Sequence, residues 1–308
     1  MIGINGISIY CPQSYIDNIE QGEKFDHDEK FIRKRLGPIK LPIVDVGIDT
    51  SDMAMFALNR LVKEYKIDKS EIEALVVVTQ NPDGEGLPHT AAIVHDKAGL
   101  ADSVAAFDIS LGCSGYVYGL SVLKGLMVEC GMEKAVLITA DPYSKVVNRN
   151  DRASTLLFGD GATATLLTNN PKVGIDKPLM STRGSGWKSI SVENGVLEMN
   201  GRAVYDFARH EVPKQIIEYL NKNNLGLDSI DMVALHQGSS AIIDAIKNKF
   251  PEHRDKFVNM LENYGNTVSS SIPIVLKECF LDDGNVNSVL VSGFGVGLSW
   301  ATTRLYKV

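Results

Sequence analysis

The sequence predicts an α/β fold made of two similar halves. Short apolar runs rich in β-branched residues alternate with segments whose apolar residues recur at helical spacing, the pattern of strands and helices packed in layers. The same order of features occurs before residue 169 and again after it: a strand, a polar residue at its end, a helix, and later a glycine-containing turn that leads into another strand. Because the turn-forming stretch at 169–171 separates the two copies, we expect two domains, 1–169 and 170–308.

Six apolar runs predict strands, and two segments between them predict long helices. The first helix begins near Ser51, with apolar residues at helical spacing as far as Tyr65, and the second runs from about Ser114 to Cys130. The predicted strands are 74–79, 104–109, 135–140, 162–167, 232–235 and 289–292. Polar residues that follow such strands are candidates for a site, because ligands of α/β proteins bind at the carboxyl ends of strands.

Composition excludes several classes of protein. The formal charge of −7 over 308 residues argues against nucleic acid as a partner, since domains that bind nucleic acid are usually basic. No apolar run approaches the ~18 residues of a membrane span, and the first residues lack a targeting pattern. The four cysteines are scattered without the spacing of a zinc site, so we expect a reduced, cytoplasmic enzyme with no metal and no membrane partner.

Cys113 is the first candidate for chemistry. It follows the strand at 104–109 and a glycine, and a helical pattern begins directly after it. The N–H groups and dipole at a helix N-terminus favour a thiolate, so we expect the thiol pKa to lie below its usual value of about 8.5. Packing of the thiol as a small buried hydrophobe is the alternative interpretation.

His236 and Asn266 are the other candidates. His236 follows the strand at 232–235 and precedes a helix, as Cys113 does in the first half. Because equivalent strand ends of a duplicated unit converge, we expect Cys113 and His236 to face one crevice. Taken singly, the histidine is compatible with structural packing, and Asn266, which follows a glycine, with turn formation.

Glycines at 293, 295 and 297 suggest a nucleotide-binding loop, but the sequence does not support that function. No helix follows at the required spacing, and no P-loop lysine is present. A glycine-rich backbone beside a nucleophile can instead supply N–H donors to an oxyanion.

Five short motifs follow one another along the chain. They are LGCSG at 111–115, FGDGAT at 158–163, HQ at 236–237, GNT with SIP at 265–273, and GFGVGLSW at 293–300. Together, in this order, they resemble β-ketoacyl-acyl-carrier-protein synthase III, the condensing enzyme that starts fatty-acid synthesis. The resemblance spans nearly the whole chain and implies the thiolase-like fold, in which two duplicated α/β halves pack as a layered αβαβα core.

The resemblance implies a role for each candidate residue. Cys113 resembles the nucleophile that accepts the acyl group, and His236 and Asn266 match the residues that complete a Cys-His-Asn triad of the initiating class. The backbone N–H groups of Cys113 and Val296 match the oxyanion hole. Both His236 and Asn266 are expected to donate hydrogen bonds to the malonyl thioester oxygen.

The implied reaction is a decarboxylative Claisen condensation with ping-pong kinetics. An acyl thioester first transfers its acyl group to Cys113, and a malonyl-carrier thioester then loses CO₂ and attacks it, giving a 3-oxoacyl thioester. No cofactor is expected, because coenzyme A or phosphopantetheine thioesters are the substrates. The implied partners are acyl-coenzyme A or an acyl-carrier protein, a malonyl-carrier protein and a second copy of the chain in a homodimer.

Four residues are expected to bind substrate. Phe31, Arg35 and Arg152 match positions that grip the coenzyme A nucleotide, although the family has tryptophan at the position of Phe31. Leu87 matches a residue from the partner subunit that closes the acyl pocket.

Several departures keep other functions open. Asp206 and Ala241 stand where basic residues that dock the carrier are expected, Ser239 replaces an asparagine, and Val296 replaces a glycine. They leave room for an acyltransferase or condensing enzyme of a specialised pathway, with a non-malonyl acceptor or an unusual starter, and more remotely for a non-catalytic carrier-binding scaffold. A hydroxymethylglutaryl-coenzyme-A-synthase-like reaction is disfavoured, because Gln80 stands where that family has a glutamate base.

Overall fold

Ten strands join into one mixed sheet in the computed structural model, which describes residues 1–308. The order across the sheet is β12-β13-β14-β8-β1-β7-β6-β4-β5, and β9 pairs with β14 off this path. The strands are β1 (Gly3–Tyr10), β4 (Ala74–Val78), β5 (Ala105–Ile109), β6 (Lys134–Ala140), β7 (Ala162–Thr168), β8 (Val173–Ile175), β9 (Leu179–Thr182), β12 (Met232–Leu235), β13 (Ser288–Gly295) and β14 (Ser299–Lys307).

The strand order repeats within this sheet. In the first half, β5, β4 and β6 are parallel, and β7 and β1 follow as antiparallel strands. In the second half, β12 and β13 are parallel, β14 and β8 follow as antiparallel strands, and a parallel bridge between Val233 and Phe257 takes the place of β5. The antiparallel pair β1–β8 joins the two sets. The division of the chain at residue 169 itself stays a prediction.

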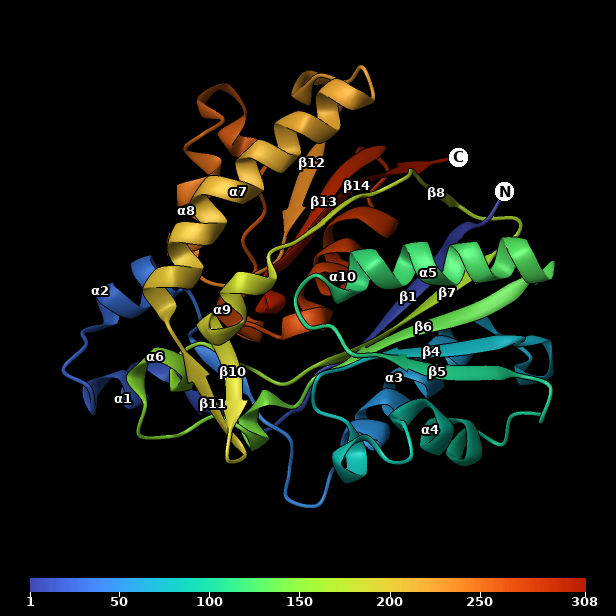
Figure 1. Cartoon of the computed structure of the whole chain (residues 1–308), viewed down its shortest axis with the longest axis horizontal. Helices are drawn as coiled ribbons and strands as arrows, with labels where there is room; N and C mark the ends of the chain where they lie inside the picture. Colours follow the sequence, from blue (N-terminus) through green and yellow to red (C-terminus); the bar gives the residue numbers. More distant parts are fainter.

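Helices fill three layers around the two halves of the sheet. The helices α3 (Thr50–Tyr65) and α4 (Thr90–Ala98) cover one face of the first half, and α5 (Gly115–Cys130) covers the other, as Figure 1 shows. In the second half, α7 (Gly201–Lys222) and α8 (Ser240–Lys247) cover the outer face, while α10 (Ser271–Leu276) lies with α5 in the middle layer. The expected αβαβα layering is therefore confirmed.

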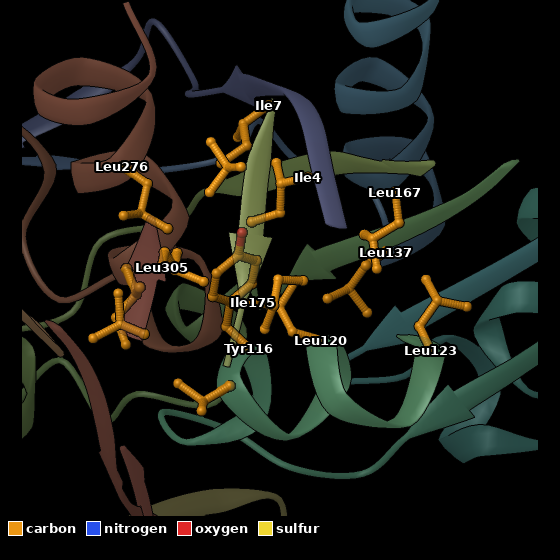
Figure 2. Packing of buried hydrophobic residues seen from close by; sticks show 14 of the residues in the cluster. Ile4, Ile7, Tyr116, Leu120, Leu123, Leu137, Leu167, Ile175, Leu276 and Leu305 are labelled. Carbon is orange, nitrogen blue, oxygen red and sulfur yellow. The ribbon is translucent and has the colours of Figure 1, made fainter. Parts of the chain in front are cut away.

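The middle layer holds the largest hydrophobic core, of 26 buried residues. Tyr116, Leu120 and Leu123 of α5 belong to this core. Leu123 lies beside Leu137 of β6 (Figure 2), and α5 also packs on β13 and β14, so one helix contacts both halves of the sheet. Removal of these apolar side chains from water is the main force that holds the halves together.

The predicted strands and helices are found within a few residues of their expected limits. The helix expected near Ser51 is α3, which begins after Asp49 in a capping box with Asp52. The helix expected from Ser114 is α5, which ends at Gly131 in the left-handed conformation that glycine adopts without strain.

Other elements lack a clear sequence signal. They include β1, whose glycines weaken its strand pattern, and α7, which contains Pro213. The shorter elements are the two-stranded sheets of β2 (Tyr15–Asp17) with β3 (Lys40–Pro42) and of β10 (Ile190–Glu193) with β11 (Val196–Met199), and the helices α1 (Asn18–Glu23), α2 (Glu29–Phe31), α6 (Arg152–Thr155) and α9 (Leu261–Tyr264). None of the helices has the length and apolar character that crossing a membrane requires.

The substitution Leu120→Ala tests the middle layer. Leu120 is fully buried, so its truncation leaves a cavity and should lower the free energy of unfolding by about 2–5 kcal/mol, measured by urea denaturation. Val128→Ala on the same helix is the matched control, because Val128 is 65% exposed and its truncation should change stability by at most about 0.5 kcal/mol. Equal effects of the two substitutions would contradict the assignment of α5 to the core.

Candidate active site

Cys113, His236 and Asn266 line one cavity of about 310 Å³. Cys113 lies between β5 and α5, and His236 follows the last residue of β12. Asn266 lies in the segment between α9 and α10. The structure therefore brings the candidates from both halves into one crevice, as the duplicated pattern predicts.

The thiol of Cys113 lies in a tightly packed apolar pocket. Cys113 is only 7% exposed and belongs to a buried cluster with Tyr143, Phe158 and Val268. Gly295 packs directly on it, since a β-carbon at position 295 would lie 2.8 Å from the Cys113 sulfur. Glycine at 295 is therefore required by the close approach of β13 to the nucleophile.

Burial raises the pKa of the Cys113 thiol to about 12, and the negative charge of Asp141 adds to this effect. Hydrogen bonds from the backbone N–H groups of Cys113 and Val296 act in the opposite direction. The expected lowering of the thiol pKa is wrong, because α5 begins only at Gly115 and desolvation outweighs the N–H groups. At neutral pH Cys113 is a thiol with two N–H donors beside its sulfur.

His236 is held by a hydroxyl that sequence reasoning missed. Its Nδ1 lies 2.8 Å from Ser271 Oγ, and the Ser271 hydroxyl donates to the Val268 carbonyl at 3.0 Å. Because that hydroxyl has a single proton, Nδ1–H is the donor to Ser271, and Nε2 keeps a lone pair. Burial lowers the pKa of His236 to about 3, so the ring is neutral. It rests as a proton acceptor in this tautomer, and its expected donation to the malonyl thioester oxygen stays a prediction.

Asn266 is oriented by a strained turn. Its Oδ1 accepts a hydrogen bond from the Val268 N–H at 2.9 Å, which leaves the amide –NH₂ group as its donor. Val268 is fully buried with a φ of 53°, an unusual conformation for a β-branched residue. In this conformation its N–H binds Asn266 and its carbonyl binds Ser271. Nothing in the sequence pattern singles out Val268 or Ser271, because serines and valines are common in turns and helices alike.

Asp141 connects this turn to the first half of the chain. The completely buried carboxylate follows β6 and accepts hydrogen bonds from the Gln80 N–H at 2.9 Å and the Thr79 hydroxyl at 3.4 Å. It also accepts from the Ser269 N–H at 3.3 Å and from the Ser269 hydroxyl. Burial raises the pKa of Asp141 to about 7, against the effect of these hydrogen bonds.

The mouth of the cavity contains two of the four predicted binding residues. Phe31 and Arg35 line it, and the ring of His27 stacks on Phe31 with centroids 4.0 Å apart. Arg152 is exposed at the start of α6 and does not line the cavity. Leu87 is 88% exposed and is also absent from the walls of the cavity of its own chain.

The residues that depart from the family pattern have local structural roles or line the cavity. Asp206 lies between Arg202 and Arg209 on α7, at 3.8 and 3.0 Å, so basic groups remain on this face. Ser239 caps α8 by accepting a hydrogen bond from the Ile242 N–H at 3.3 Å. Ala241 and Val296 line the cavity, together with Ser239.

No group of three or more histidine, cysteine, aspartate or glutamate side chains is arranged to hold a metal ion.

Comparison with known proteins identifies the family of this chain. Residues 107–184 match the family 3-Oxoacyl-[acyl-carrier-protein (ACP)] synthase III, and residues 220–306 match its C-terminal part. Beta-ketoacyl-[acyl-carrier-protein] synthase III of Lactococcus lactis subsp. cremoris is 35% identical, with 95% of each chain covered.

Solved structures of condensing enzymes are similar to this chain over nearly its whole length. The 3-oxoacyl-[acyl-carrier-protein] synthase III of Aquifex aeolicus has a TM-score of 0.90 at 28% identity, covering 99% of this chain and 100% of that one. The priming beta-ketosynthase of the R1128 polyketide pathway has a TM-score of 0.88 at 26% identity, covering 99% and 96%.

The fold is the thiolase-like fold, and the chain is an acyl-transferring condensing enzyme. Within that class, the chain belongs to the β-ketoacyl-acyl-carrier-protein synthase III family.

The pH dependence of Cys113 alkylation tests its protonation state. Since burial raises the thiol pKa to about 12, the thiolate fraction at neutral pH is small. The rate of labelling by iodoacetamide should rise about tenfold per pH unit between pH 7 and 10, followed by mass spectrometry of the Cys113 peptide. A Cys113→Ser variant controls for labelling elsewhere, and a rate that levels off below pH 8 would show a thiolate in the resting enzyme.

Proposed function

We propose that the protein catalyses the decarboxylative condensation of an acyl thioester with a malonyl-carrier thioester, as in the initiation of fatty-acid synthesis. The observation that carries this proposal is the shared cavity, in which a thiol, an imidazole, an amide and two backbone N–H donors meet. These are the groups that acyl transfer and enolate stabilisation require.

Acyl transfer begins from a protonated Cys113 thiol and a neutral His236 imidazole. The Cys113 thiol passes its proton to Nε2 of His236 as the sulfur attacks the thioester carbonyl. The Cys113 and Val296 N–H groups stabilise the oxyanion, and the bond to the leaving sulfur then breaks. The leaving thiolate takes the proton from His236, which gives acyl-Cys113 and a free thiol. The neutral imidazole with its free lone pair supports this role as the base.

Condensation uses Asn266. The malonyl thioester loses CO₂, and the electrons of the broken C–C bond form an enolate whose oxygen accepts a hydrogen bond from the Asn266 amide. Its carbon attacks the carbonyl of acyl-Cys113, the C–S bond breaks, and the released Cys113 thiolate takes up a proton from solvent water. His236 becomes a second donor to the enolate when its Nε2 carries a proton. One such donor is worth roughly 3–4 kcal/mol of barrier.

Coenzyme A or phosphopantetheine thioesters are the proposed substrates. Phe31 and Arg35 at the mouth offer an aromatic face and a cation to such a nucleotide or phosphate. Arg152 contributes from α6 outside the cavity. The steps above need only the thioesters and the side chains, so the proposal includes no cofactor and no metal, and the four free cysteines fit a reducing cytoplasm.

A homodimer completes the proposal. Strand β5 ends the sheet with one edge unpaired, and its five residues are only partly buried. Such an edge favours pairing with another strand. Pairing of two β5 edges would cover the exposed Leu87 loop and bring Leu87 to the partner subunit's acyl pocket.

A condensing enzyme that primes a specialised pathway is the second candidate. The departures at Asp206, Ser239 and Ala241 favour it, as does the likeness to the R1128 priming enzyme. Normal formation of acyl-Cys113 without consumption of a malonyl thioester would favour a different acceptor. The complete Cys-His-Asn set argues against a non-catalytic scaffold.

The substitution Cys113→Ala tests the proposal. Intact-protein mass spectrometry after incubation with acyl-coenzyme A and acyl-carrier thioesters should show one acyl adduct on the wild type and none on Cys113→Ala. Condensation should fall by at least about 10³-fold, because no other group forms the acyl-enzyme. Cys130→Ala is the matched control, since Cys130 is exposed on α5 and should not affect either measurement. A full adduct or full condensation in Cys113→Ala would refute the proposed nucleophile.

A further inference from the structure

A buried tyrosine lines the cavity that contains the nucleophile. Tyr143 lines the cavity, is only 5% exposed and belongs to the same buried cluster as Cys113. Its ring packs against Phe158 with centroids 4.8 Å apart. Because both rings are buried, neither can swing aside without opening a cavity in this cluster. The space for an acyl chain beyond the sulfur therefore ends at an aromatic wall.

The hydroxyl of Tyr143 is a polar group within this wall. It donates to Gln80 Oε1 at 3.3 Å. Gln80 Oε1 itself lies against the backbone next to Cys113, since a β-carbon at Gly112 would be 2.5 Å from it. Burial raises the pKa of Tyr143 well above its usual value, and the negative charge of Asp141 adds to this effect, so the hydroxyl stays protonated.

The direction of this hydrogen bond determines what the hydroxyl can recognise. A phenol has one proton, and that of Tyr143 is used by Gln80. The lone pairs of its oxygen remain, and they accept a hydrogen bond but cannot give one. A hydroxyl on the acyl chain is such a donor, whereas a methylene group would leave the oxygen without a partner in a dry pocket.

We propose that Tyr143, positioned by Gln80, selects a short acyl group that carries a hydroxyl as the starter. The inference rests on the proposed function, because it requires that Cys113 accepts the acyl group from a thioester. Tyr143 limits the chain length with its ring and selects the hydroxyl with its oxygen.

Two pairs of thioesters that differ by one hydroxyl test this proposal. The rate constant kcat/KM for acylation of Cys113 is measured by mass spectrometry with 3-hydroxybutyryl- against butyryl-coenzyme A, and with lactoyl- against propionyl-coenzyme A. The wild type should prefer the hydroxylated member of at least one pair by about tenfold or more. It should accept octanoyl-coenzyme A poorly.

Two variants separate the ring from its hydroxyl. Tyr143→Phe should reduce the preference to about one, because it removes the accepting oxygen and keeps the ring. Tyr143→Leu should gain at least about tenfold with octanoyl-coenzyme A, because it opens the wall. Tyr118→Phe is the control, since the Tyr118 hydroxyl on α5 donates to the Ser181 carbonyl at 3.2 Å and Tyr118 does not line the cavity.

The outcomes are distinguishable. No preference in either pair, or a preference that persists in Tyr143→Phe, would overturn the inference and leave the proposed function intact. Absence of any adduct from every thioester in the folded wild type would overturn the proposed function, and the inference with it.

Discussion

Four hydrogen-bond donors converge on the buried carboxylate of Asp141, and they come from both halves of the chain. Thr79 and Gln80 lie at the end of β4, while Ser269 contributes its N–H and its hydroxyl from the segment after Asn266. Removal of the carboxylate would leave all these donors unpaired in a dry interior, at a cost of several kcal/mol. The relative position of the nucleophile and its partners therefore depends on this one group.

The turn that Asp141 holds carries the rest of the site. Val268 directs its N–H to Asn266 and its carbonyl to Ser271, and Ser271 in turn accepts from His236. The left-handed φ of Val268 is unfavourable for a branched residue, so the surrounding hydrogen bonds must maintain it. The strained backbone of Val268 thus orients the side chain of Asn266 directly and that of His236 through Ser271.

Desolvation controls the protonation of the site. Cys113 rests as a thiol and His236 as a neutral imidazole, because burial disfavours the charged form of each. Charge then develops only during the reaction, where fixed N–H donors and an amide stabilise it more strongly than they would in water.

Much of this architecture could be predicted from sequence, because short β-branched runs and helical spacing are local signals. The strand ends before Cys113 and His236 followed from these signals, and the duplicated pattern placed both in one crevice. The thiol pKa could not be predicted, since it depends on burial by Tyr143, Phe158 and Gly295 from distant parts of the chain. The roles of Ser271 and Asp141 depend on hydrogen bonds between residues far apart in sequence, which leave no local pattern.

The central claim is that Cys113 and Asn266 serve different half-reactions: Cys113 accepts the acyl group, and Asn266 promotes decarboxylation. Both half-reactions are measured separately in Asn266→Ala, as acyl-Cys113 formation by mass spectrometry and as CO₂ release from a malonyl-carrier thioester. The account predicts acylation within about twofold of the wild type and CO₂ release lower by about 10²–10³-fold. Equal losses in both half-reactions, or an unchanged rate of CO₂ release, would contradict it.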